Sequence, residues 1–132
     1  AAFEPDVRED LEKVIMAVSA EAGLPGQAEM DAAQEADIAQ GRLLMSSEEI
    51  NCTRCHTFRE MTEGDAGPAL TGWGSREWML GMLHDPADPS FYGNRNDRMP
   101  SFGADEILSD AEMGLVVDWL RGDWTSQHTP EP

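Results

Sequence analysis

Both cysteines of the 132-residue chain lie close together, in the segment Cys52-Thr53-Arg54-Cys55-His56. This placement excludes a fold that is held together by a framework of dispersed disulfides. The C-x-x-C-H pattern is typical of covalent haem attachment. Two thiols at this spacing can each reach a vinyl group on adjacent pyrroles, and the imidazole of the next residue is then held beneath the iron. The pattern therefore predicts one haem c, attached through Cys52 and Cys55 and ligated by His56.

Two other uses of a cysteine pair fit the sequence less well. A structural zinc site needs four ligands, but outside the motif the chain offers only His84 and His128 and no second cysteine pair. A redox-active dithiol of the thioredoxin type expects a βαβ context, which the periodicity of this chain does not provide. A chance occurrence of the motif is the third alternative.

Hydrophobic periodicity predicts helices separated by long loops. Apolar residues at helical spacing follow Pro5, ahead of a break at residues 23–26, and a second helical stretch is expected over roughly residues 28–45. Ser75 is a plausible N-cap for a short helix that stops before Pro86. Residues 85–103 are expected to form an ordered loop.

The last expected helix begins with a capping box at residues 109–112 and ends at Gly122. Residues 125–132 are expected to be a frayed tail. No run alternates like a strand, so the fold class is all-α. The expected organisation is an N-terminal helical extension over residues 1–30, a haem domain over residues 31–124 and the tail.

The charge balance excludes several classes of partner. Nine basic and 26 acidic residues give a net charge of −17, whereas a nucleic-acid binder needs a basic surface and an anionic membrane also attracts basic segments. No stretch approaches the roughly 20 apolar residues of a membrane span. Residues 51–100 hold seven acids and five bases, so the acidity belongs to the two ends of the chain.

Two further segments extend the haem motif into a family pattern. Gly67-Pro68-Ala69-Leu70 follows His56, and Met99-Pro100 lies in a loop ahead of the last helix. With these segments, residues 36–122 resemble the class I c-type cytochromes, small mono-haem electron carriers. The resemblance implies a class I cytochrome c fold, in which helices and long loops surround one covalent haem, here with an extra N-terminal helix. It also implies that the carbonyl of Pro68 accepts the Nδ1–H of His56, that Leu70 packs on the porphyrin and that Met99 is the distal ligand.

Other residues compete for the distal position. Met79, Met82 and Met113 lie at apolar helical positions and are expected in the core, whereas the other methionines apart from Met99 lie before the motif or too near it. His84 could ligate iron, but it ends a short helix, where an imidazolium interacts favourably with the helix dipole. His128 lies in the tail. Met99 alone is in a loop rich in Pro and Gly before the last helix.

The resemblance suggests two more features. In the family, the helix before the motif crosses the last helix at a glycine and an aromatic residue, which match Gly41 and Trp119; an ordinary helical glycine and a core tryptophan are the alternative. The anionic haem propionates need N–H, O–H and guanidinium donors. The candidates, each of which could equally have a surface or packing role, are Trp73, Arg76, Tyr92, Asn94 and Arg95.

A His56/Met99-ligated haem predicts an electron carrier rather than an enzyme, since both axial positions are filled. The resemblance places the chain in the periplasm or on the outer face of the inner membrane, between a redox-protein donor and acceptor. Residues 70–78 and 91–100 also resemble cytochrome c domains of bacterial cytochrome bc-type complexes, so one alternative is a haem domain or subunit of a membrane respiratory complex. A haem enzyme or gas sensor with a labile sixth ligand is another. Because Arg54 and Arg98 lie near the expected haem edge, docking is predicted to be local and weakly charged.

Overall fold

The computed structural model describes residues 4–64 and 66–123. Five α-helices make up its regular structure, and in these residues no strand forms beyond one isolated bridge between Phe58 and Met61. The helices are α1 (Pro5–Ala20), α2 (Ala28–Ala33), α3 (Glu35–Leu44), α4 (Arg76–His84) and α5 (Asp110–Arg121). Three 3₁₀ turns lie between them: η1 (Pro25–Gln27), η2 (Cys52–Arg54) and η3 (Gly93–Arg95). The all-α prediction is confirmed.

The helix ends follow the local signals in the sequence. The hydroxyl of Ser75 accepts a hydrogen bond from the Trp78 amide and caps α4. Ser109 and Glu112 form the expected capping box at the start of α5, and Gly122 ends that helix with a positive φ of 74°. The expected frayed tail lies outside the described residues.

The single helix expected over residues 28–45 is instead two helices. Gln34 leaves the helical conformation, with φ −106° and ψ 15°, and separates α2 from α3. Glu35 and Asp37 then lie in the first turn of α3, where carboxylates interact favourably with the helix dipole. A new helix therefore begins at Glu35.

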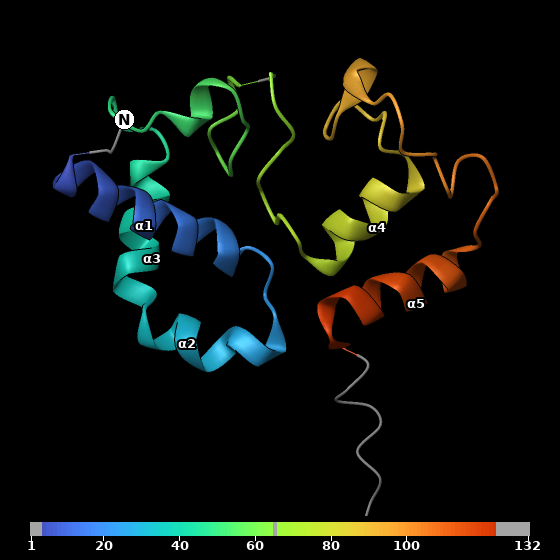
Figure 1. The fold of residues 1–132 in the computed structure, drawn as a ribbon, viewed down its shortest axis with the longest axis horizontal. Coiled ribbons are helices and arrows are strands. Elements are labelled where there is room, and N and C mark those ends of the chain that lie inside the picture. Colours follow the sequence, from blue (N-terminus) through green and yellow to red (C-terminus); the bar gives the residue numbers. More distant parts are fainter. Residues whose placement is uncertain (1–3, 65, 124–132) are drawn as a thin grey trace, which may run out of the picture.

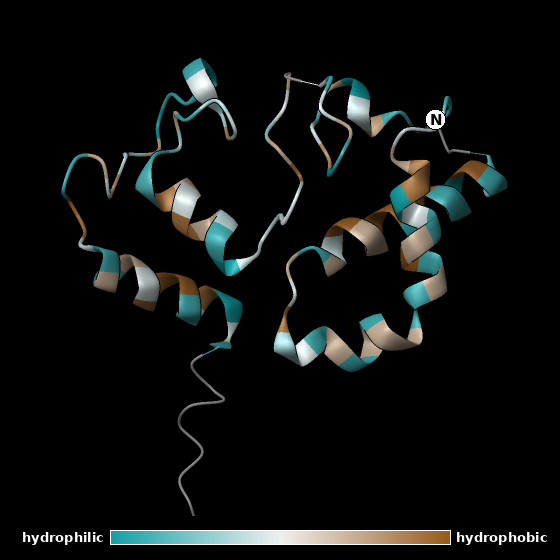
Figure 2. Cartoon of the chain, turned by 180° about the vertical axis from the view of Figure 1, so that it is seen from behind, coloured by the Kyte–Doolittle hydropathy of each residue, from teal (hydrophilic) through white to brown (hydrophobic). Residues whose placement is uncertain are grey.

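The N-terminal helix α1 packs against α3 and contributes to the hydrophobic core. Val14 of α1 joins Met45 and Phe58 in one buried cluster, against which Leu70 also packs. Figure 1 shows α1, α2 and α3 on one side of the molecule and α4 and α5 on the other, joined by the chain that follows the cysteine motif. In Figure 2 apolar and hydrophilic residues alternate along α1 and α5, as in amphipathic helices.

The expected crossing of Gly41 with Trp119 is wrong. A Cβ atom at Gly41 would lie 2.0 Å from the carbonyl oxygen of Lys13, so Gly41 permits close approach of α1. The side of α3 that contains Gly41 is thus occupied by α1, and Trp119 is 65% exposed on α5. Among the expected core methionines, Met82 and Met113 are buried and Met79 is half-buried.

Polar contacts of Arg121 connect the two sides of the molecule, and a further contact joins α4 to α5 within one side. The guanidinium of Arg121 in α5 donates hydrogen bonds to the carbonyl oxygens of Ala22, after α1, and Gly74, before α4, at 2.8 and 2.6 Å. Arg76 in α4 donates to the carboxylate of Asp118 in α5. No helix of the described chain is long and apolar enough to cross a membrane.

Candidate haem-binding site

The cysteine motif forms a tight turn in the chain after α3. Asn51 adopts a left-handed conformation (φ 47°) ahead of η2, and the amides of Cys55 and His56 both donate to the carbonyl oxygen of Cys52, at 3.1 and 3.0 Å. The Thr53 amide donates to Met45, which is fully buried. The turn is thereby attached to the core, and it holds the two thiols and the imidazole within one short segment.

Both cysteines are free, and their surroundings differ. Cys52 is half-buried beside the hydrophobic cluster, whereas Cys55 is exposed. Burial raises the pKa of the Cys52 thiol, because the uncharged form is favoured away from water, and the neighbouring Cys55 adds to this effect. Neither thiol is joined to the other, so both are chemically available for thioether formation.

The ring of His56 is oriented by the loop that follows it. Its Nδ1–H donates to the carbonyl oxygen of Pro68 at 2.8 Å, the contact that the family resemblance implies. Gly67 lies against the ring, since a Cβ at this position would be 2.4 Å from Cε1 of His56. Nε2 makes no hydrogen bond within the described chain. One ring nitrogen is therefore fixed, and the other is free to act as a ligand.

A second glycine allows the loop to lie close to the turn. A Cβ at Gly64 would be 2.5 Å from the carbonyl oxygen of Thr53 and 2.6 Å from the amide nitrogen of His56. The Gly67 amide donates to the carbonyl oxygen of Cys55 at 2.7 Å. With the free thiols and the free Nε2 atom, this geometry fits a haem attached through Cys52 and Cys55 and ligated by His56.

Met99 lies in the chain between α4 and α5, and Figure 1 shows these two helices on the side of the molecule opposite α1–α3. Its side chain is half-buried, and its backbone is held by Asn96, whose amide donates to the Met99 carbonyl at 2.8 Å and accepts from the Met99 N–H at 3.2 Å. Asn96 was not among the residues expected at the site. An asparagine three residues ahead of the methionine could have pointed to it, because Asn side chains often bond to nearby backbone.

Leu70 is also close to the motif, through its backbone. Its amide donates to the carbonyl oxygen of Thr57 at 2.9 Å, and its side chain packs against the cluster of Val14, Met45 and Phe58. The neighbouring Ala69 carbonyl accepts from the indole N–H of Trp78. Residues 67–70 therefore connect the motif to α4 as well as to the core.

The candidates for the propionate contacts have different surroundings. Arg76 is paired with Asp118, and the guanidinium of Arg95 donates to the carbonyl oxygen of Ala66. The remaining three, Trp73, Tyr92 and Asn94, have exposed side chains. His84, the other candidate ligand, ends α4 and is exposed; His128 lies outside the described residues.

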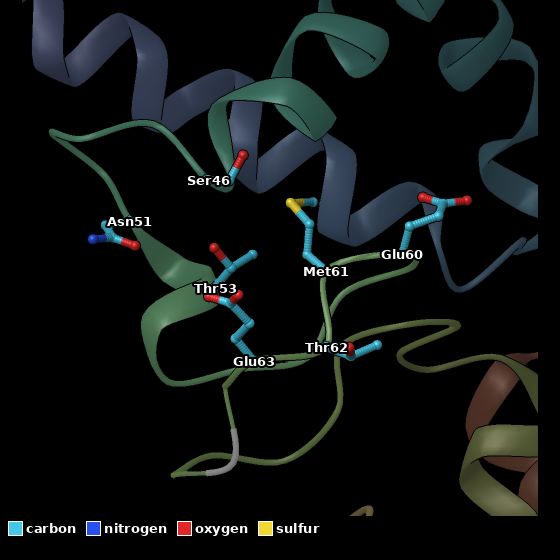
Figure 3. Close-up of a pocket in the computed structure, with 7 residues that line it drawn as sticks. All are labelled: Ser46, Asn51, Thr53, Glu60, Met61, Thr62 and Glu63. Carbon is cyan, nitrogen blue, oxygen red and sulfur yellow. The ribbon is translucent and has the colours of Figure 1, made fainter.

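A surface pocket lies beside the cysteine turn, between residues 46–53 and 60–63 (Figure 3). Its lining includes the carboxylates of Glu60 and Glu63 and none of the cysteines, His56 or Met99. A haem carries two anionic propionates, and carboxylate-lined surfaces disfavour further negative charge. This pocket is therefore distinct from the candidate haem site.

Comparison with known proteins gives one match. The family model described as cytochrome c oxidase, cbb3-type, subunit III matches residues 36–120. A search of curated proteins and a search of solved structures found no significant match. The matched segment contains nearly all of α3 and α5, together with the cysteine turn and the loops around Pro68 and Met99. The chain therefore belongs to the family of cbb3-type cytochrome c oxidase subunit III and contains a c-type cytochrome domain.

Proposed function

We propose that the chain transfers single electrons between redox proteins through one haem c, attached through Cys52 and Cys55 and axially ligated by His56 and Met99. The observation that carries this proposal is the 2.8 Å hydrogen bond from His56 Nδ1 to Pro68 O, directly after the two free thiols. When bound, the haem supplies an iron centre that takes up and releases one electron at a time.

The residues of the chain have separable roles in this proposal. Cys52 and Cys55 keep the macrocycle covalently in place, and the Pro68 carbonyl fixes the His56 ring and makes its Nε2 a better donor. The thioether of Met99 would fill the remaining axial position and raise the reduction potential. With neither position open, we infer that the chain is an electron carrier and not itself an enzyme.

A membrane respiratory complex is the favoured setting. The family match is to an oxidase subunit, so we place this domain in, or next to, such a complex, in the periplasm or on the outer face of the inner membrane. Association with a bc-type complex, which the sequence around Met99 also suggests, is the second candidate. The donor and acceptor are redox proteins in either case.

The test is production of the chain together with a cytochrome c maturation system. We expect haem to remain with the polypeptide on a denaturing gel, and the Cys52→Ala/Cys55→Ala double variant to lose it. The ferric holoprotein should show the thioether-to-iron charge-transfer band at the red end of its spectrum, and Met99→Ala should abolish that band. Haem that leaves the wild-type chain on denaturation would contradict covalent attachment.

The same experiment separates a carrier from a haem enzyme or gas sensor. A carrier with two protein ligands should bind carbon monoxide slowly in its ferrous form, and Met99→Ala should bind it rapidly. Met79→Ala is the matched control, because this methionine lies in α4. Rapid carbon monoxide binding by the wild-type protein would favour the enzyme or sensor instead.

A further inference from the structure

One side chain holds both backbone polar groups of Met99. The amide Nδ2 of Asn96 donates to the Met99 carbonyl oxygen at 2.8 Å, and its Oδ1 accepts the Met99 N–H at 3.2 Å. Asn96 and Met99 are both half-buried. The pair of bonds fixes the orientation of the Met99 backbone relative to Asn96 and limits the directions in which the thioether can point.

Asn96 is itself held in place by a backbone hydrogen bond, and the residue before it contacts the loop that orients His56. Its backbone N–H, directly after η3, donates to the carbonyl oxygen of Gly93, the first residue of η3. The preceding residue, Arg95, donates to the carbonyl oxygen of Ala66, two residues before Pro68. A backbone bond from Ala69 N to Ser90 O, at 2.9 Å, joins the same two segments. The loop of Met99 is thus anchored to the loop that orients His56.

The chain after Met99 has its own anchors. Pro100 restricts the backbone through its fixed φ, and its carbonyl accepts the Phe102 N–H at 3.0 Å. The hydroxyl of Ser101 donates to the carboxylate of Asp85 at 3.0 Å. Met99 therefore lies between two anchored residues, Asn96 and Ser101, and Asn96 is the one that bonds to Met99 directly.

We propose that Asn96 is a positioning residue that holds Met99 in the loop conformation in which its thioether serves as the distal ligand. This inference rests on the proposed function, since it requires that Met99 is that ligand. Two ordinary hydrogen bonds correspond to roughly a ten- to hundredfold shift between the held and the released loop. Loss of the amide should make Met99 that much easier to displace.

The experiment measures how readily carbon monoxide displaces Met99 in the ferrous holoprotein. Asn96→Ala should bind carbon monoxide about tenfold faster or more, with a weaker thioether-to-iron band in the ferric state. Asn96→Asp keeps the acceptor for the Met99 N–H but, when ionised, loses the donor; it should lie between Asn96→Ala and wild type. Asp97→Ala is the matched control, because this side chain is 81% exposed in the same loop, and it should behave as wild type.

Met99→Ala separates this inference from the proposed function. If Met99→Ala binds carbon monoxide at the wild-type rate, Met99 is not the ligand and both proposals fail. If Met99→Ala binds rapidly while Asn96→Ala and Asn96→Asp bind at the wild-type rate, the positioning role of Asn96 is overturned and ligation by Met99 stands. Equal acceleration by Asp97→Ala would also overturn it. Should Asn96→Ala fail to mature, Asn96→Asp carries the same test.

Discussion

The carboxylate of Glu21, at the end of α1, accepts two hydrogen bonds from the guanidinium of Arg59, in the loop that follows the cysteine motif, at 3.0 and 2.5 Å. The other oxygen of the same carboxylate accepts the Gly72 N–H at 2.9 Å. The Glu21 side chain is only 4% exposed. An N-terminal helix outside the family match is thus tied to both loops next to the candidate haem site.

We expect Glu21→Ala to lower the free energy of unfolding by about 2 kcal/mol. The change removes charged hydrogen bonds and leaves the Gly72 amide without its acceptor; because Arg59 is partly exposed, water compensates for some of the loss. Urea unfolding of the holoprotein followed by circular dichroism measures it. Glu12→Ala, in an exposed pair with Arg8, should change stability by less than about 0.5 kcal/mol. Equal effects of the two variants would contradict the buried role of Glu21.

Gly41 provides a second test of how α1 packs. A Cβ at this position would collide with the backbone of Lys13, so Gly41→Ala should destabilise the protein by about 2 kcal/mol despite the better helix propensity of alanine. Gly26→Ala is the control, since a Cβ there meets nothing within 4 Å.

A double-mutant cycle distinguishes this packing from a crossing of Gly41 with Trp119. Trp119 is mostly exposed, so Trp119→Ala should cost less than about 1 kcal/mol, and its effect should add to that of Gly41→Ala. A coupling above about 1 kcal/mol between the two substitutions would instead show that α3 and α5 cross there.

Interactions between residues close together in the chain could be predicted from the sequence, whereas those between distant residues could not. The caps at Ser75 and Ser109 were predictable because each depends on a residue three positions away. The break at Gln34 was not, because the apolar and acidic pattern continues through it. The packing of α1 on Gly41 and the bonds of Arg121 join residues far apart in the chain, and no local pattern specifies such partners.

The candidate site shows the same division. The cysteine turn and the His56–Pro68 contact could be expected from the motif and the family resemblance, since both lie within 17 consecutive residues. The role of Asn96 was missed because its two bonds depend on the loop conformation around Met99. The pairing of Arg76, one of the propionate candidates, with Asp118 was not foreseen, because Asp118 is on another helix.

The pairing of Arg76 with Asp118 predicts a pH dependence. The hydrogen bond from Arg76 lowers the pKa of Asp118, so the pair stabilises the folded state above the unfolded pKa of about 4, and this contribution is lost as the pH falls through the lowered value. Asp118→Asn should be less stable than wild type at neutral pH, and the difference should vanish in acid. Urea unfolding at several pH values measures this. Asp97→Asn, in a highly exposed pair with Arg98, is the control; a deficit of Asp118→Asn that persisted in acid would point to lost packing instead.

We expect the charge close to Met99, and not the net charge of the chain, to control the approach of an oxidant. Arg98 is 90% exposed, one residue before Met99, whereas many of the acidic residues lie near the ends of the chain. If electrons leave near the Met99 loop, oxidation of the ferrous holoprotein by ferricyanide depends on local charge. Arg98→Glu should then slow oxidation several-fold at low ionic strength, and the effect should disappear at high salt as the charges are screened. Arg8→Glu makes the same change in net charge on α1, at a side chain that is 76% exposed, and should have little effect. Equal slowing by both variants would show that the net charge of −17, and not the surface around Met99, controls the approach of the oxidant.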